Sequence, residues 1–215
     1  MNTLVIICSK SPNPNLYRCI EHLYTIQIQK DPENNYKIIV IDSDSNDFTN
    51  YDNVKNSFPE VELLFIQNKN YEYGAWKYAY SIYPNFDNYF CIQDTIFVKT
   101  KIDLNQINNE NAYTVHHRSG YHHHMSIKSM GIENLKNTGL DYKDIIDTEF
   151  NLALHSSFIV NNNVMQDIFK TLINPPVDKI GSCFYERNFG LYFIIKQINT
   201  IDLNFYTIKS HGNRY

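Results

Sequence analysis

Glycine is scarce in this chain of 215 residues, which has only 7 glycines, and the loop after the first apolar segment contains none. That segment covers residues 3–8, and Ser9-Lys10-Ser11-Pro12 follows it. Dinucleotide-binding folds place glycines in this loop, because the backbone must approach the pyrophosphate closely. The missing glycines therefore argue against an ordinary NAD-binding fold.

Cysteine and basic charge are also in short supply. The 4 cysteines lie far apart without a CxxC spacing, so we expect neither a zinc site nor a disulfide framework. The 19 Lys and Arg residues are outnumbered by 23 Asp and Glu residues, which gives a net charge of −4. Such a chain has no basic face for bulk nucleic-acid binding, and we expect no nucleic-acid partner.

Long apolar runs are missing as well. The N-terminal run over residues 4–8 is far too short to span a bilayer. It also lacks the basic start and the small-residue cleavage site of a signal peptide. Cys8 and Cys91 stand in apolar segments and are typical of small core residues in a reducing compartment. We expect no transmembrane segment and a cytoplasmic location.

Apolar segments nevertheless make up much of the chain, since hydrophobic residues account for 43% and charged residues for 20%. In the first hundred residues, apolar runs typical of buried strands alternate with helical patterns. This alternation predicts an α/β fold, with a mostly parallel sheet covered by helices on both faces. Strands are predicted at 3–8, 36–41, 61–66 and 89–92, an extended segment at 96–98, and helices at 15–29, 54–58 and 73–82.

The second half of the chain is less regular. Strands are predicted at 112–116, 157–160 and 205–209, and helical segments at 134–138, 141–146, 163–172 and 183–197. The chain has neither an internal repeat nor a linker-like stretch, and its length suits one domain. We therefore expect a single domain over residues 1–215.

An acidic cluster follows the second predicted strand, at residues 42–47. Ligands of open α/β sheets bind beyond the carboxyl ends of the strands. There, Asp42 and Asp44 can accept hydrogen bonds from a ribose or a base edge. The alternative is a solvated turn, in which Asp and Asn side chains cap the next element.

A single carboxylate, Asp94, follows the fourth predicted strand in the motif Gln93-Asp94-Thr95. A carboxylate at the end of an apolar strand must be hydrated, paired or bound to a metal. Mg²⁺ and Mn²⁺ prefer oxygen ligands and often bridge one or two carboxylates to substrate phosphates. The alternative is an Asp that caps a turn.

Glu186 lies within the otherwise apolar helical segment 183–190. An apolar environment raises the pKa of a carboxyl group, so that it can act as a general base. The alternative is a pair of Glu186 and Arg187 on the surface of a helix.

Several histidines lie in the second half of the chain. We interpret the run at 122–124 as a polar loop rather than a metal site. His211 stands beside Gly212 near the end of the chain, and there it can fold back over a cleft and ligate a metal. The alternative for His211 is an ordinary residue of the C-terminal tail.

Together, and in this order, these features resemble the GT-A glycosyltransferases, especially the family-2-like enzymes of bacterial and viral glycan clusters. The resemblance covers roughly the first hundred residues, and a Glu-bearing helix and a late His extend it loosely. It is based on the strand and polar loop over 4–11, the acidic cluster at 41–45, Asn68 before the helix of Gly74 and Ala75, and Gln93-Asp94-Thr95 in the place of a DxD motif.

The resemblance implies a nucleotide-sugar-binding half over residues 1–100 and an acceptor-binding half over residues 101–215. It implies inverting transfer from a UDP- or GDP-sugar to a glycan or other hydroxyl acceptor, with Mn²⁺ or Mg²⁺. A viral source would place the protein in the host cytoplasm. Glu186 would be the catalytic base, and Asp94 and His211 the metal ligands. The implied substrate-binding residues are Ser9, Lys10, Asp42, Asp44, Asn68, Gly74, Gln93, His155 and Tyr185.

The chain departs from the pattern at the DxD motif, where it has one carboxylate instead of two. Metal binding then relies on Asp94 with His211, or it is weak, or activity has been lost. Two other functions stay open. A nucleotidyltransferase uses a similar sheet and metal but usually carries a glycine-rich loop. A non-catalytic sugar-nucleotide-binding module suits the incomplete motif, and metal-dependent hydrolysis of a UDP- or GDP-sugar would count against it.

Overall fold

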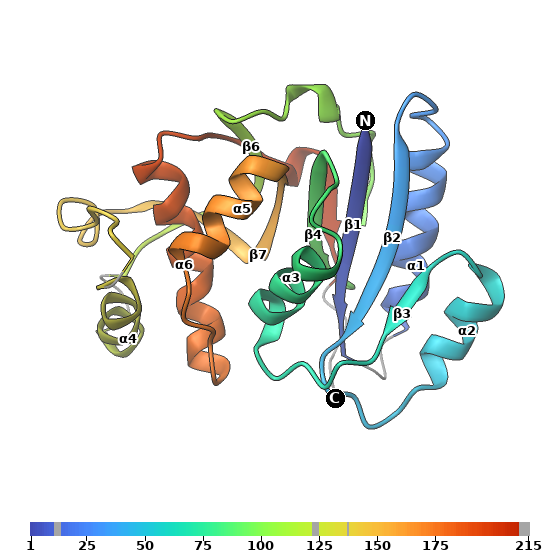
Figure 1. The fold of residues 1–215 in the computed structure, drawn as a ribbon, viewed down its shortest axis with the longest axis horizontal. Helices are drawn as coiled ribbons and strands as arrows, with labels where there is room; N and C mark the ends of the chain where they lie inside the picture. Colours follow the sequence, from blue (N-terminus) through green and yellow to red (C-terminus); the bar gives the residue numbers. More distant parts are fainter. Residues whose placement is uncertain (11–13, 122–124, 137, 211–215) are drawn as a thin grey trace.

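The computed structural model describes residues 1–10, 14–121, 125–136 and 138–210, and Figure 1 shows their arrangement. The strands are β1 (Asn2–Ser9), β2 (Asn35–Asp42), β3 (Glu62–Leu64), β4 (Asn88–Gln93), β5 (Ile96–Val98), β6 (Asn111–Ser119), β7 (Phe150–Asn161), β8 (Asn199–Asp202) and β9 (Thr207–Lys209). The helices are α1 (Asn15–His22), which continues as a π-helix over Leu23–Ile28, α2 (Thr49–Ser57), α3 (Tyr71–Ile82), α4 (Met125–Leu135), α5 (Asn162–Thr171) and α6 (Lys179–Ile195), with 3₁₀ turns at Leu104–Gln106 and Leu203–Phe205.

A sheet of seven strands forms the centre, in the order β3-β2-β1-β4-β7-β6-β8. The strands β3, β2, β1 and β4 are parallel neighbours. β7 is antiparallel to both β4 and β6, and β8 is parallel to β6. The predicted α/β class with a mostly parallel sheet is therefore confirmed.

Both faces of the central strand β1 are buried. Leu4 and Ile6 face a core that includes residues of α3, α5 and α6, which lie in front of the sheet in Figure 1. Val5 and Ile7 face the opposite core, which includes residues of α1 and α2. All four side chains are completely buried. A strand covered on both faces needs no polar alternation, and this explains the continuous apolar run.

β7 is longer than the predicted strand 157–160, and it contains a bulge. Its pairing with β6 shifts from Thr114↔Phe158 to His116↔Ala153, so residues 154–157 stand outside the register of the two strands. Within this bulge, His155 and Ser156 have φ angles of 58° and 50°. A positive φ angle in a residue other than glycine costs on the order of 1–3 kcal/mol. The conformation persists only where neighbouring groups stabilise it. The indole of Trp76 does so by donating a 2.9 Å hydrogen bond to the carbonyl of Ser156.

Residues 141–146 do not form the predicted helix. The amide of Ile146 donates to the carbonyl of Tyr142 at 2.9 Å, but the segment continues only as a turn. The first turn of a helix fixes the backbone angles of several residues but forms only one hydrogen bond. A single turn therefore does not offset the conformational entropy that is lost. The prediction is therefore wrong.

The last strands also differ from the prediction. β8 pairs with β6 from Asn111↔Asn199 to Thr114↔Asp202, although its segment is mostly polar. At the edge of the sheet, backbone pairing stabilises it without an apolar pattern, so hydrophobicity does not reveal it. The predicted strand 205–209 is shortened to β9, which forms a small separate sheet with β5.

The helices of the described ranges are modest in length, and the 17-residue α6 is partly polar. Within those ranges, no helix combines the length and apolar character needed to cross a lipid bilayer.

Candidate functional site

Ser9, Asp42 and Asp94 meet at the carboxyl edge of the sheet. β1 lies between β2 and β4, so that Ser9 stands opposite Asp42, and Cys8 opposite Gln93. The hydroxyl Oγ of Ser9 donates to Oδ2 of Asp94 at 2.8 Å. The three side chains are buried, with exposed fractions of 1%, 4% and 0%. The parallel register alone therefore collects polar groups from three strands at one place.

Both carboxylate oxygens of Asp42 hold the loop after β2. Oδ1 accepts a 2.6 Å hydrogen bond from the hydroxyl of Tyr51, and Oδ2 accepts one of 3.0 Å from the amide of Ser45. Burial raises the pKa of Tyr51, and the carboxylate of Asp42 raises it further. Asp42 thus closes a turn, but it is buried there rather than solvated as the alternative interpretation expected, and its contact with a ribose stays a prediction.

A polar cavity of about 280 Å³ opens beside this loop. It contains three of the predicted substrate-binding residues, Lys10, Asp44 and Asn68. Asp44 and Tyr71, which also line it, have φ angles of 58° and 53°. Left-handed backbone at residues other than glycine is often found at ligand sites, where the surrounding structure holds it. Its remaining lining residues are Ser43, Lys69 and Val177.

Asn68 connects this cavity to the start of α3. Its Nδ2 donates to Oγ of Ser43 at 3.1 Å and to the carbonyl of Tyr71 at 2.7 Å, while Oδ1 accepts from the amide of Asn70 at 3.0 Å. A Cβ atom at Gly74 would lie only 2.2 Å from Oδ1 of Asn68. Gly74 is therefore needed to make room for this side chain, and a direct contact of Gly74 with substrate stays a prediction.

A chain of polar contacts surrounds the motif Gln93-Asp94-Thr95. The ammonium Nζ of Lys209 donates to Oε1 of Gln93 and to Oγ1 of Thr95, both at 2.6 Å. Nε2 of Gln93 in turn donates to Oε1 of Glu72 at 2.5 Å. Both ends of the Gln93 amide are thus used to join β4 to α3 and β9, and its predicted contact with substrate is untested.

The carboxylate of Glu186 lies against the bulge of β7. Its Oε1 accepts a 3.0 Å hydrogen bond from the backbone amide of His155, and the imidazole Nδ1 of that residue is 4.0 Å away. The side chain of Glu186 is 19% exposed. Burial raises the pKa of Glu186 to about 7, and the charge of Glu72 acts in the same direction against the His155 amide, Arg187 and Lys179. A carboxylate with this pKa can accept a proton near neutral pH.

Glu186 and the strand edge belong to one site. β4 pairs with β7 up to Cys91↔Phe158, so the bulge adjoins the carboxyl end of β4. Glu72 joins the two parts, because it binds Gln93 and its charge acts on Glu186.

The neighbours of Glu186 on α6 are buried. Arg187 is 6% exposed, and its guanidinium donates to the carbonyls of Gly120 and Cys183 at 3.1 and 2.9 Å. The alternative of a surface pair with Glu186 therefore does not describe this helix. Tyr185 is 1% exposed and donates its hydroxyl to the carbonyl of Asn174. Contact between Tyr185 and an acceptor stays a prediction.

Of the two predicted metal ligands, Asp94 lies within the described residues. His211 lies outside them, as do the histidines at 122–124. In the part of the chain that the structure describes, no group of three or more His, Cys, Asp or Glu side chains is arranged to hold a metal. The residues on either side of Asp94 bind the ammonium of Lys209 instead. These side chains by themselves do not fit a divalent ion. Ligation of Mn²⁺ or Mg²⁺ by Asp94 with His211 stays a prediction.

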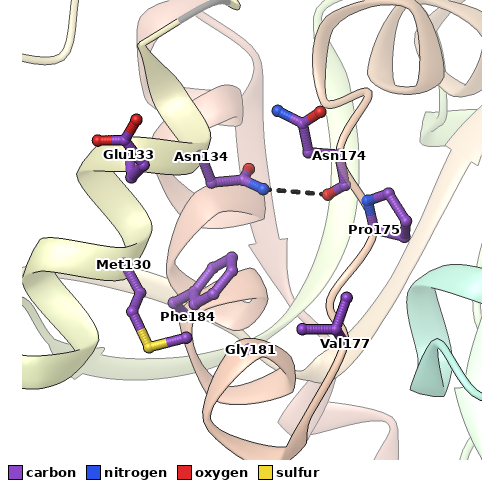
Figure 2. Close-up of a pocket in the computed structure, with 8 residues that line it drawn as sticks. All are labelled: Met130, Glu133, Asn134, Asn174, Pro175, Val177, Gly181 and Phe184. Carbon is purple, nitrogen blue, oxygen red and sulfur yellow. Dashed lines mark hydrogen bonds between the residues drawn. The ribbon is translucent and has the colours of Figure 1, made fainter.

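A second cavity, of about 350 Å³, lies between α4, α6 and residues 174–177 (Figure 2). Its lining is mostly apolar and includes Met130 and Phe184, and Asn134 donates a 3.0 Å hydrogen bond across it to the carbonyl of Asn174. Val177 lines both this cavity and the polar cavity beside Asp44. The two cavities therefore adjoin each other at Val177.

Three residues of the site were not predicted from the sequence. Glu72 stands in the first turn of α3, where an acid is ordinarily attributed to the helix dipole. Tyr51 is one of 17 tyrosines. Lys209 binds Gln93 across 116 positions of the sequence, and no local pattern signals such a contact.

No protein-family profile matches the chain, and no curated protein matches its sequence. Among solved structures, the fold is similar to the apo form of the WbbM bifunctional glycosyltransferase. That match has a TM-score of 0.44 and 14% identity, and it covers 94% of this chain and 38% of that one. The fold is also similar to the crystal structure of S. aureus TarS, with a TM-score of 0.35 and 13% identity over 47% of this chain and 18% of that one. This chain thus corresponds to well under half of the length of either protein.

Proposed function

We propose that this chain is a glycosyltransferase that moves a sugar from a nucleoside diphosphate-sugar to a hydroxyl group of a glycan or another acceptor. The observation that carries the proposal is Glu186, a carboxylate with a pKa of about 7 beside the sheet edge of Asp42 and Asp94. Strand-end acids suit nucleotide binding. A base with a near-neutral pKa adds the group that activates a hydroxyl nucleophile.

The donor occupies the polar cavity at the carboxyl ends of β1 and β2. Asp44 and Asn68 offer hydrogen-bonding groups for ribose and base, and Lys10 lies in the same cavity as a partner for phosphate. The buried pair of Asp42 and Tyr51 braces the loop that carries Asp44. A UDP-sugar and a GDP-sugar are both candidate donors.

In the transfer step, Glu186 takes the proton of the acceptor hydroxyl while the acceptor oxygen attacks the anomeric carbon of the sugar. The bond from that carbon to the diphosphate oxygen breaks, and its electron pair leaves with the nucleoside diphosphate. Attack opposite the leaving group inverts the anomeric configuration. The amide of His155 fixes the orientation of the carboxylate through its 3.0 Å hydrogen bond.

The acceptor approaches from the side of α6, because that helix and β7 supply Glu186 and His155. The apolar cavity of Figure 2 lies on the same side and offers room for part of an acceptor. The acceptor cavity borders the donor cavity, since Val177 lines both.

The test begins with a thermal-shift screen of UDP- and GDP-sugars with and without Mn²⁺, because a bound donor stabilises the folded state by mass action. Donors that bind are then assayed for hydrolysis and for transfer. Glu186→Gln should abolish transfer but retain donor binding, whereas the matched variant Glu21→Gln, at an exposed position of α1, should keep both.

The outcomes separate the candidate functions. Full transfer by Glu186→Gln would remove this residue as the base. Donor binding by the wild-type protein without turnover of any donor would favour the non-catalytic binding module. Stabilisation by a nucleoside triphosphate with release of pyrophosphate would favour a nucleotidyltransferase.

A further inference from the structure

We infer that the ammonium of Lys209 binds the diphosphate of the donor in the place of a divalent metal, so that donor binding does not require Mn²⁺ or Mg²⁺. The inference rests on the proposed function, because it concerns the donor of that same site. Its basis is the position of Lys209, which is bonded to both residues that flank Asp94.

The backbone around Lys209 is tied to the turn that carries Asp94. Lys209 pairs with Ile96 in the small sheet of β5 and β9. The amide of the next residue, Ser210, donates to the carbonyl of Thr95 at 2.8 Å. Both the backbone and the side chain of Lys209 are thus held in place. Most of the rotamer entropy of this lysine is therefore lost on folding rather than on ligand binding.

Lys209 binds the two residues that flank Asp94 in the sequence. The charges of Lys209 and Asp94 both act on the buried thiol of Cys19, whose Sγ donates to the carbonyl of Ile96 at 3.3 Å. Burial raises the pKa of Cys19, Asp94 raises it further, and Lys209 lowers it. The thiol of Cys19 therefore lies within electrostatic range of both charges.

A diphosphate at this edge needs positive partners, because Asp42, Asp44 and Asp94 make the edge acidic. Lys10 supplies one from the polar cavity, and Lys209 supplies a second at the motif itself. A second carboxylate at position 93 or 95 would attract a divalent cation. Here these positions carry the neutral oxygens of Gln93 and Thr95, and each accepts a 2.6 Å hydrogen bond from an ammonium. A lysine is a compact point charge that suits phosphate oxygens.

The experiment measures calorimetric binding of uridine, UDP, guanosine and GDP to the full chain, in EDTA and in MnCl₂. The variants are Lys209→Met, Lys209→Gln and Lys209→Arg. Lys99→Met is the matched control, because Lys99 directly follows β5 of the same small sheet but its ammonium binds the carbonyl of Asn204 at 3.0 Å. Nucleoside binding and circular dichroism report whether each variant is folded.

In EDTA, the wild-type protein should bind one nucleoside diphosphate more tightly than its nucleoside. Lys209→Met and Lys209→Gln should lose about 10- to 100-fold of the diphosphate affinity and keep the nucleoside affinity. Lys99→Met should bind like the wild type, and Lys209→Arg should keep more of the diphosphate affinity than Lys209→Met, because it retains the positive charge.

Two results would overturn the inference alone: diphosphate binding only in MnCl₂, or equal diphosphate affinity of Lys209→Met and the wild type. A wild-type protein that binds none of the four compounds in either buffer would instead overturn the proposed function, and this inference with it.

Discussion

The hydroxyl of Ser9 donates a 2.8 Å hydrogen bond to the completely buried carboxylate of Asp94, and so joins the ends of β1 and β4. A hydrogen bond to a charged group contributes more to stability than one between neutral groups. This contact is therefore part of the fold as well as of the site.

Ser9→Ala should lower the free energy of unfolding by about 1.5–3 kcal/mol, because it removes a donor from a buried charge. Urea denaturation measures the change. Ser81→Ala is the control, since the Ser81 hydroxyl binds a carbonyl on exposed helix surface, and it should change stability by less than about 0.5 kcal/mol. Equal losses in both variants would contradict the prediction.

Glu186→Gln should change how stability depends on pH. The pKa of Glu186 is raised in the folded protein from 4.5 to about 7, so the folded state binds the proton more tightly than the unfolded chain. Stability from this group is present below pH 4.5 and is lost as the pH rises toward 7. Over that interval the loss is roughly 2–3 kcal/mol in the wild type, and it is absent in the variant.

Denaturation curves at several pH values test this difference. The gap between Glu186→Gln and the wild type should widen in favour of the variant from pH 4.5 to 7 and then stay constant. Parallel pH profiles for the two proteins would show that Glu186 has an ordinary pKa.

Gly74→Ala should destabilise the protein although alanine is the better helix former. The added Cβ would lie 2.2 Å from Oδ1 of Asn68 and 2.7 Å from Cβ of Asn70. Overpacking of this kind costs about 1–3 kcal/mol. Since the closest clash is with a side chain, Asn68→Ala should recover part of the loss in a double-mutant cycle. Strict additivity of the two changes would argue against this contact.

Tyr51→Phe should also destabilise the protein, by about 1.5–3 kcal/mol, because Oδ1 of Asp42 loses its 2.6 Å hydrogen bond. The ring remains, so its edge-to-face contact with Phe65 is retained. Thermal unfolding measures the effect. Tyr17→Phe, at a tyrosine that is 37% exposed, should leave the unfolding temperature nearly unchanged. A similar shift in both variants would show that Asp42 does not depend on Tyr51.

The first half of the fold was predictable because its strands are buried on both faces. Continuous apolar runs such as Leu4 to Ile7 are typical of strands buried in this way, and turn residues separate them from helical patterns. The second half was harder, because β8 is mostly polar and β7 shifts its register with β6 at its bulge. Pairing with β6 determines both strands. Such pairing joins distant segments of the chain, and the local sequence pattern does not reveal it.

By itself, the sequence determined the α/β class and the convergence of Ser9, Asp42 and Asp94, because parallel strands bring their carboxyl ends to one edge. Only the tertiary structure decided what those groups touch. It placed Glu72 and Lys209 at Gln93, and it placed the bulge of β7 against Glu186. The physical reason is that the burial and the electrostatic environment of a side chain depend on neighbours from distant segments. The composition of any one segment does not reveal which neighbours these are.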